Sequence, residues 1–225
     1  MNRYAIIVAG GKGQRMGTEV PKQFLTVAGK PVLMHTLERF YQADTTIQLI
    51  LVLPEMHSVT WENLCEEFNF QVPHSVVNGG EQRYHSVLNG LSAIEETEAL
   101  VAIHDGVRPL VTDTIINGAY AQAEQLGSAI VAVKPKDSLR VLHENGSKAV
   151  ERNNYVLVQT PQVFRLQAIR EAYAANYSPS FTDDASVYEV SGERVYLFDG
   201  DYRNIKITTP EDLLLAEVLL SDSYR

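Results

Sequence analysis

Residues 3–16 read RYAIIVAGGKGQRM, an apolar run that passes directly into a glycine-rich loop. Glycine tolerates positive φ angles and lets consecutive backbone N–H groups approach an anion. Lys12, Arg15 and, just after the loop, Lys22 add positive charge. A plain strand-to-helix turn would explain the glycines but not the spacing of the cations. We therefore interpret the loop as a binding site for a triphosphate.

Two common phosphate-binding loops also follow a first strand, and neither fits this sequence. The dinucleotide fingerprint Gly-x-Gly-x-x-Gly fails because Met16 stands where the third glycine belongs. The Walker motif needs Gly-Lys followed by Ser or Thr, whereas the Gly-Lys pairs here continue into Gly13 and Pro31. The loop is therefore of a third kind.

Short apolar runs alternate with helical patterns through the first 133 residues. Strands are expected over residues 3–9, 48–53, 74–77, 100–104 and 129–133, and helices from residue 31 and over 62–68, 83–95 and 113–125. This order predicts an α/β fold, Rossmann-like, with a mainly parallel sheet flanked by helices and ligands at the carboxyl ends of the strands. Because no linker divides the chain, residues 1–225 are interpreted as one domain.

The C-terminal third is expected to be more irregular. Helices are predicted over residues 165–175 and 183–190, and extended segments over 194–198 and 205–208. Pro210 is predicted to start a terminal helix. The residues that this helix is expected to turn inward are Leu213, Leu214, Ala216, Leu219 and Leu220.

A β-hairpin interrupts the alternation after Val133. Residues 138–143 and 147–150 alternate around Glu144-Asn145-Gly146, and Asn-Gly between such runs is a strong hairpin signal. The segment has few large apolar groups, so it would be marginally stable alone in water. We expect a protruding arm over about residues 136–155 that either contacts a partner subunit or forms a flap on its own chain.

Three positions on or near the expected strands could bind or act on a substrate. Asp105 could bind Mg²⁺, which is usually held by one or two carboxylates together with phosphate oxygens, or it could simply cap the turn before Gly106. Gly80 could expose backbone groups to a base edge, with the Ser86 hydroxyl nearby. Lys206, on an expected strand, is either solvated or directed at an anion.

Composition excludes several classes of partner. The chain has 28 acidic and 19 basic residues and a net charge of -9, which argues against nucleic acid or an anionic membrane as a partner. Its apolar runs are too short to span a bilayer, and the single cysteine, Cys65, suits a reducing, cytoplasmic compartment. The histidines lack metal-ligand spacing. We favour a phosphoryl-transfer mechanism in which a phosphate group of the substrate is the attacking nucleophile, because such a mechanism needs no nucleophile from the protein.

Five motifs resemble the sugar-phosphate cytidylyltransferase family, in particular the members that act on 2-C-methyl-D-erythritol 4-phosphate. They lie at residues 9–16 with 21–24, 80–87, 104–109, 159–162 and 204–212. The resemblance implies a single nucleotidyltransferase domain that transfers CMP from CTP to this polyol phosphate, with Mg²⁺. The alternatives are the same reaction on ribitol 5-phosphate and a nucleotide-binding sensor without turnover.

The resemblance also implies roles for individual residues. Arg15 and Lys22 would stabilise the transition state, and Arg152 and Lys206 would position the polyol phosphate. CTP would contact Ala9, Gly10, Gly11, Lys12, Gly13, Gly80, Glu81 and Ser86. The polyol phosphate would also lie near Asp105, Arg108, Thr160 and Thr182, with Asp105 at the metal. Family members are homodimers with crossing arms, so Arg152 and Thr160 would serve the neighbour's active site.

Overall fold

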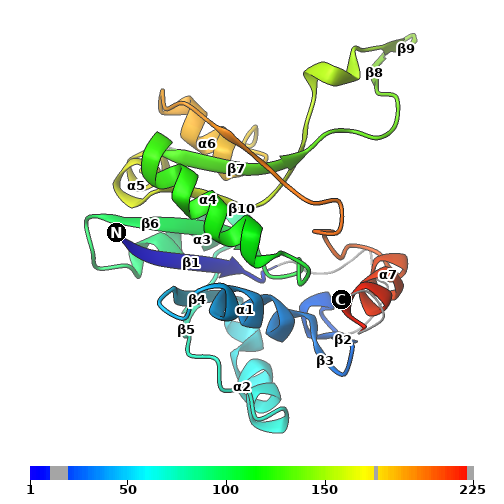
Figure 1. Ribbon diagram of the computed structural model, residues 1–225. Coiled ribbons are helices and arrows are strands. Elements are labelled where there is room, and N and C mark those ends of the chain that lie inside the picture. The colour runs from blue at the N-terminus through cyan, green and yellow to red at the C-terminus, as the bar shows by residue number, and fades with distance from the viewer. Residues whose placement is uncertain (11–19, 175–176, 222–225) are drawn as a thin grey trace.

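A seven-stranded sheet forms the centre of the protein (Figure 1). The computed structural model describes residues 1–10, 20–174 and 177–221. The strand order is β11-β7-β10-β6-β1-β4-β5, and neighbouring strands are parallel except where β10 pairs antiparallel with β6 and β7. The strands are β1 (Asn2–Val8), β4 (Gln48–Leu53), β5 (Ser75–Asn78), β6 (Ala99–Asp105), β7 (Ser128–Val133), β10 (Leu157–Arg165) and β11 (Leu197–Asp199). The predicted mainly parallel α/β fold is confirmed, although β10 was not expected.

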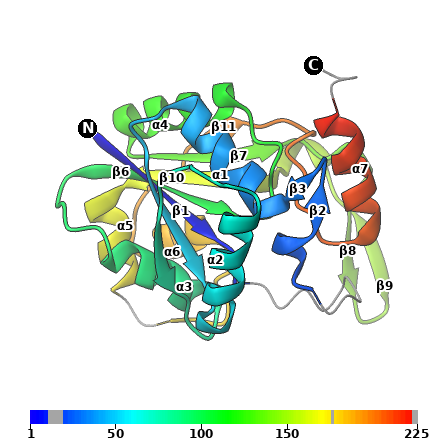
Figure 2. The same cartoon turned by 90° about the horizontal axis from the view of Figure 1, so that it is seen from below.

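Helices cover both faces of the sheet, as Figures 1 and 2 show. They are α1 (Val32–Ala43), α2 (Ser58–Glu67), α3 (Arg83–Ser92), α4 (Asp113–Leu126), α5 (Leu166–Tyr173), α6 (Asp184–Val190) and α7 (Pro210–Leu220). Along β1, Ala5 and Ile7 pack on one face with α1, α2 and α4, while Ile6 packs on the other with α3, α5 and α6. A parallel strand buried on both faces must be apolar throughout, which explains the run at the start of the chain. Among the described residues, no helix combines the length and apolar character needed to cross a membrane.

The carboxyl ends of β1, β4 and β6 meet at one edge of the sheet. Val8 is in register with Val52 and with Asp105. Beyond the strands, the Gly106 N–H donates to the Val8 carbonyl over 2.9 Å. A Cβ on Gly106 would lie 3.2 Å from the Ala9 Cβ, so glycine permits this close approach of the two loops. Ala9 and Gly106, at the starts of the loops after β1 and β6, therefore lie side by side.

The predicted hairpin forms a projecting arm (Figure 1). Its strands β8 (Arg140–His143) and β9 (Gly146–Ala149) pair antiparallel, and all eight residues are exposed. The connection is Glu144-Asn145, whereas Gly146, which was expected in the turn, begins β9 and pairs with His143. Within the described chain, these strands are not buried against the sheet.

Two expectations about the C-terminal segment are wrong. Lys206 lies on no strand of the described chain. Its segment runs beside the loop after β6 and cannot pair with β6 itself, because β1 and β10 occupy both edges of that strand. There the Ile207 N–H donates to the Val107 carbonyl over 2.9 Å. Leu214 does not face inward: it is 71% exposed, because α7 packs through Ala216 instead.

Candidate active site

Two adjoining pockets open where the carboxyl ends of β1 and β6 meet the loops. The first pocket, of about 250 Å³, has walls from the loop after β1, the loop before α3 and Lys22. The second pocket, of about 290 Å³, is lined by β10, Arg108 and the segment before α6. Both pockets are lined by Arg83, Asp105 and Lys206. These three charged side chains therefore form the boundary between the two spaces.

A larger hollow of about 820 Å³ lies at the opposite edge of the sheet, beside the amino ends of β4 and β5. Its lining, among the described residues, includes Glu95 and Glu96 but no lysine or arginine. A phosphate-bearing substrate would be repelled there. Size alone therefore does not identify the site, and the two smaller pockets have the charge that such a substrate needs.

Lys22 is held in the first pocket by its neighbours in the sequence. It begins the short 3-10 helix η2 (Lys22–Phe24), in which Gln23 and Phe24 are buried. The Gln23 amide donates to the Ala9 carbonyl over 2.9 Å, and the Phe24 ring stacks on Trp61. From this fixed backbone, the Lys22 ammonium donates to the Ile207 carbonyl over 3.0 Å. Residues distant in sequence, Lys22 and Lys206, thus lie on neighbouring walls.

The loop before α3 is shaped by its own first helical turn. The Gly80 N–H donates to the Ser86 hydroxyl, which in turn donates to the Gln82 carbonyl, each over 3.1 Å. The Ser86 hydroxyl therefore stabilises the loop in addition to lining the pocket. A Cβ on Gly80 would lie 2.3 Å from the Cβ of His85, so only glycine fits without a shift.

On the expectation that this loop contacts CTP, replacing Gly80 with alanine should raise the KM for CTP about tenfold, or roughly 1.4 kcal/mol of binding free energy. The added methyl group would push the loop away from His85 and distort the first pocket. Steady-state kinetics would measure this, with the KM for the polyol phosphate as the internal control, since Gly80 does not line the second pocket. An unchanged KM for CTP would contradict this assignment of the loop.

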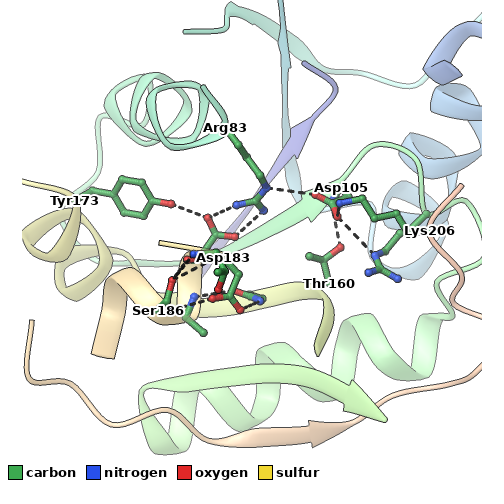
Figure 3. A network of polar contacts seen from close by, with 12 residues as sticks. Arg83, Asp105, Thr160, Tyr173, Asp183, Ser186 and Lys206 are labelled. Atoms are coloured by element: carbon green, nitrogen blue, oxygen red, sulfur yellow. Dashed lines mark hydrogen bonds and ion pairs between the residues drawn. The ribbon is translucent and has the colours of Figure 1, made fainter. Parts of the chain in front are cut away.

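Asp105 is the centre of a cluster of cations (Figure 3). Its Oδ2 lies 2.8 Å from Lys206 Nζ and 3.7 Å from Arg108 Nε, and its Oδ1 lies 3.4 Å from Arg83 Nε. Burial by itself raises the pKa of the Asp105 carboxyl, but Arg83, Lys206 and Arg108 outweigh that effect and hold this pKa below its usual range. The group is therefore a carboxylate at neutral pH. The reading of Asp105 as a mere turn cap accounts for none of these ion pairs.

The adjacent His104 adds no charge to this cluster. Burial lowers the pKa of its imidazole to about 3, so the ring is neutral at physiological pH. One ring nitrogen lies 3.2 Å from the Arg108 carbonyl. His104 therefore packs as part of the core, in keeping with the absence of metal-ligand spacing among the histidines.

Arg83 and two of its partners, Asp184 and Tyr173, were not among the site residues expected from the sequence. The Arg83 guanidinium donates to both carboxylate oxygens of Asp184, over 2.8 and 2.7 Å, and the Tyr173 hydroxyl donates to the same carboxylate over 2.6 Å. Arg83 lies in the quoted motif at residues 80–87, which was the available signal. Its role was missed because Asp184 is 101 residues away and no local pattern pairs them.

The second pocket is built around Arg108 and Thr160. The Arg108 guanidinium donates to the Asn204 carbonyl over 2.7 Å, while its buried Nε has no hydrogen-bond partner among the described residues. The Thr160 hydroxyl accepts a hydrogen bond from the Asp105 N–H over 3.1 Å. Thr182 also lines this pocket. The expectation that Thr160 serves the neighbour's site is wrong, because β10 places it beside Asp105 of its own chain.

The remaining expected residues differ in where they lie. Arg152 is exposed in the short helix η4 (Arg152–Asn154), donates to the Lys136 carbonyl over 2.8 Å and lines neither pocket. Arg15, Gly11, Lys12 and Gly13 lie outside the described residues. Ala9, Gly10, Glu81 and Ser86, for which contact with CTP is predicted, line the first pocket.

The site can contribute to a magnesium site, but not complete one alone. Within the described part of the chain, no group of three or more His, Cys, Asp or Glu side chains could hold a metal ion. Asp105 is a carboxylate on the boundary of both pockets, and Mg²⁺ accepts one or two carboxylates when phosphate oxygens complete its octahedron. The donor set therefore fits magnesium that arrives with a phosphate ligand.

Residues 4–222 match the family model described as 2-C-methyl-D-erythritol 4-phosphate cytidylyltransferase. A protein of that name from Bacteroides thetaiotaomicron is 52% identical over 220 residues, which cover 98% of this chain and 100% of that protein. Its counterpart from Phocaeicola vulgatus is 51% identical with the same coverage. The crystal structure of 2-C-methyl-D-erythritol 4-phosphate cytidylyltransferase from Francisella tularensis has a TM-score of 0.82 and 31% identity, and the match covers 98% of this chain and 100% of that one.

Proposed function

The chain belongs to the 2-C-methyl-D-erythritol 4-phosphate cytidylyltransferase family, and on that premise we propose how its residues carry out the reaction. The enzyme transfers CMP from CTP to 2-C-methyl-D-erythritol 4-phosphate and releases pyrophosphate, a step of non-mevalonate isoprenoid biosynthesis. CTP occupies the first pocket and the polyol phosphate the second. The observation that carries this assignment is the shared boundary of Arg83, Asp105 and Lys206.

The reaction joins the two substrates at that boundary. An oxygen of the polyol phosphate attacks the α-phosphorus of CTP, the bond from that phosphorus to the bridging oxygen breaks, and pyrophosphate leaves. The attacking phosphate is largely dianionic at neutral pH, because its second pKa lies near 6, so no general base is needed. The protein must align two anions and neutralise their repulsion. Lys22 and Arg15 stabilise the charge on the reacting phosphorus, while Lys206 and Arg108 hold the incoming phosphate.

Base recognition is assigned to the walls of the first pocket that come from the loop after β1 and the loop before α3. The Ala9 backbone, Gly80, Glu81 and Ser86 contact cytosine, and Gly10, Gly11, Lys12 and Gly13 contact the rest of CTP. Asp105 would hold Mg²⁺ together with phosphate oxygens. Magnesium supplies positive charge that offsets the repulsion between the substrate phosphates. Thr160 and Thr182 border the polyol.

In this proposal, two copies of the chain form a homodimer through their arms. The arm carries exposed apolar side chains, Leu142 at 82% and Val141 at 43% exposure, which association would remove from water. Arg152 lies off both pockets of its own chain, so its contribution would go to the partner's second pocket. Residues 1–225 act as one nucleotidyltransferase domain that includes the arm at about residues 136–155, and the single cysteine suits a cytoplasmic location.

Mixing two inactive variants tests the shared site. Arg152→Ala chains keep Lys22, and Lys22→Ala chains keep Arg152, so a mixed dimer has one site with both groups. Equal mixing with full subunit exchange is therefore expected to restore about a quarter of wild-type activity per active site. Mass spectrometry of isotopically labelled chains would verify the exchange. Verified exchange without recovery would show that Arg152 acts within its own chain.

Turnover is expected with CTP and 2-C-methyl-D-erythritol 4-phosphate in the presence of Mg²⁺, measured as released pyrophosphate. Ribitol 5-phosphate lacks the branched carbon and is expected to react much more slowly. Removing magnesium with EDTA should stop the reaction, and added Mg²⁺ should restore it. Pyrophosphate release that survives EDTA would remove Asp105 from the proposed metal role. No release with either polyol phosphate would favour a sensor without turnover.

A further inference from the structure

Asp105 has two basic partners that differ in how firmly they are held. Lys206 comes from a segment without regular structure, its side chain is 40% exposed, and it meets Asp105 Oδ2 over 2.8 Å. Arg83 starts α3, its side chain is 32% exposed, and it meets Asp105 Oδ1 over 3.4 Å. The shorter ion pair is thus made by the more exposed side chain, which can turn toward an entering phosphate.

Arg83 is held on its other side by a buried carboxylate. Two guanidinium nitrogens bind both oxygens of Asp184, a geometry that fixes the plane of the guanidinium. The Asp184 side chain has no exposed surface, and the Tyr173 hydroxyl donates to it over 2.6 Å. Asp184 is also the first residue of α6, where the helix dipole favours a negative charge. Figure 3 shows Arg83 between Tyr173 on one side and Asp105 on the other.

We propose that Asp184 is a positioning residue for the transfer reaction: by holding Arg83, it keeps a fixed cation beside Asp105 while Lys206 is released to the polyol phosphate. This inference rests on the proposed roles of Asp105 and Lys206. Asp184 itself lines neither pocket, so it acts only through Arg83. A series of contacts then links the α5 and α6 side of the sheet to the reacting phosphates. It runs from Tyr173 through Asp184 and Arg83 to Asp105.

Charge explains why the reaction needs such a partner. When a phosphate takes Lys206, Asp105 loses its closest cation and would face two anionic substrates. A mobile arginine would be drawn onto those phosphates as well, leaving the carboxylate without a fixed orientation. Because Asp184 takes two of the guanidinium nitrogens, Arg83 keeps its Nε toward Asp105. Asp105 then stays in one orientation throughout the reaction.

A double-mutant cycle tests whether Asp184 works through Arg83. Asp184→Asn, nearly the same shape, is expected to lower kcat about tenfold to a hundredfold, the usual effect of removing a supporting partner behind a site. The KM for CTP should change much less. In an Arg83→Gln background, the same substitution should change kcat less than about twofold, since the group it positions is gone. If the fold losses in kcat of the two single variants multiplied in the double variant, the proposal would be overturned. A normal kcat in Asp184→Asn would overturn it too.

Asp184→Asn leaves a charged guanidinium beside an amide, and Arg83→Gln leaves the buried Asp184 carboxylate without its cation, so either single variant carries a risk of misfolding. The double variant Arg83→Gln with Asp184→Asn leaves no unpaired charge in this pair, so it keeps the test open if Asp184→Asn alone does not fold. A double variant slower than Arg83→Gln by more than a few-fold would then count against the proposal. Asp184→Glu, which keeps the carboxylate, should recover most of the lost kcat. Failure of that recovery in a folded protein would also overturn it.

Arg3 and Asp44 provide a matched control at the opposite edge of the sheet. They form a half-buried ion pair over 3.1 Å that lies in neither pocket. Arg3→Gln with Asp44→Asn is expected to leave kcat unchanged. If the wild-type enzyme transfers CMP but the cycle is additive, only the role of Asp184 fails. If the wild type does not transfer CMP, the proposed function fails first.

Discussion

Replacing Lys22 with alanine is expected to lower kcat roughly a hundredfold, which corresponds to about 3 kcal/mol of transition-state stabilisation. The ammonium lies in the first pocket beside the Lys206 segment, where negative charge would accumulate on the α-phosphorus. CTP would keep its contacts with the glycine loop, so the KM for CTP should change far less than kcat.

Single-turnover kinetics would separate the chemical step from CTP binding. Lys30→Ala is the matched control: Lys30 pairs with Glu38 over 2.8 Å and lines neither pocket, so its loss should leave kcat unchanged. The backbone at Lys22 is held by buried Gln23 and Phe24, so the Lys22→Ala variant is expected to fold. Near-normal turnover would exclude Lys22 from the reaction.

The parallel part of the sheet was predictable because its strands are buried on both faces. Such strands must be continuously apolar, and β1, β4 and β6 were found within one or two residues of their bounds. Strand β10 was missed for the opposite reason. It contains Gln159, Thr160, Pro161 and Gln162, a polar run that is typical of a loop, yet these side chains are buried beside the second pocket. The polar residues of β10 are explained by the pocket that they border and not by strand propensity.

The same contrast holds within the site. Gly80, Asp105 and Lys22 could be singled out because each stands next to an expected strand or turn, where a parallel sheet gathers its ligands. The pair of Arg83 and Asp184 joins α3 to α6, and only the folded chain brings these residues within 3 Å of each other. The resemblance placed Thr160 at the neighbour's site, whereas the antiparallel course of β10 brings it to its own Asp105. Contacts between distant elements carry no local signature.

Replacing Asp105 with asparagine is expected to lower kcat by at least a hundredfold, or about 3 kcal/mol. The amide has nearly the same shape, but it loses the charge that Arg83, Lys206 and Arg108 share. Three cations would then repel one another across the boundary of the pockets, and the proposed magnesium ligand would be weakened. Asp113→Asn, at an exposed aspartate in the first turn of α4, is the matched control and should leave kcat unchanged.

The free energy of unfolding can distinguish what the charge of Asp105 contributes from what its shape contributes. In the metal-free enzyme, Asp105→Asn should lower the free energy of unfolding by on the order of 2 kcal/mol at neutral pH, because Arg83, Arg108 and Lys206 lose their shared partner. The folded-state pKa of Asp105 is depressed, so its contribution is present above the unfolded-state pKa of about 3.9 and is lost as the pH falls below it. The difference between wild type and variant, measured by urea unfolding, should therefore stay constant near neutral pH and shrink below about pH 4. A difference that persisted at low pH would mean that the aspartate stabilises the fold through its shape, and its charge would no longer explain how the cations are held together.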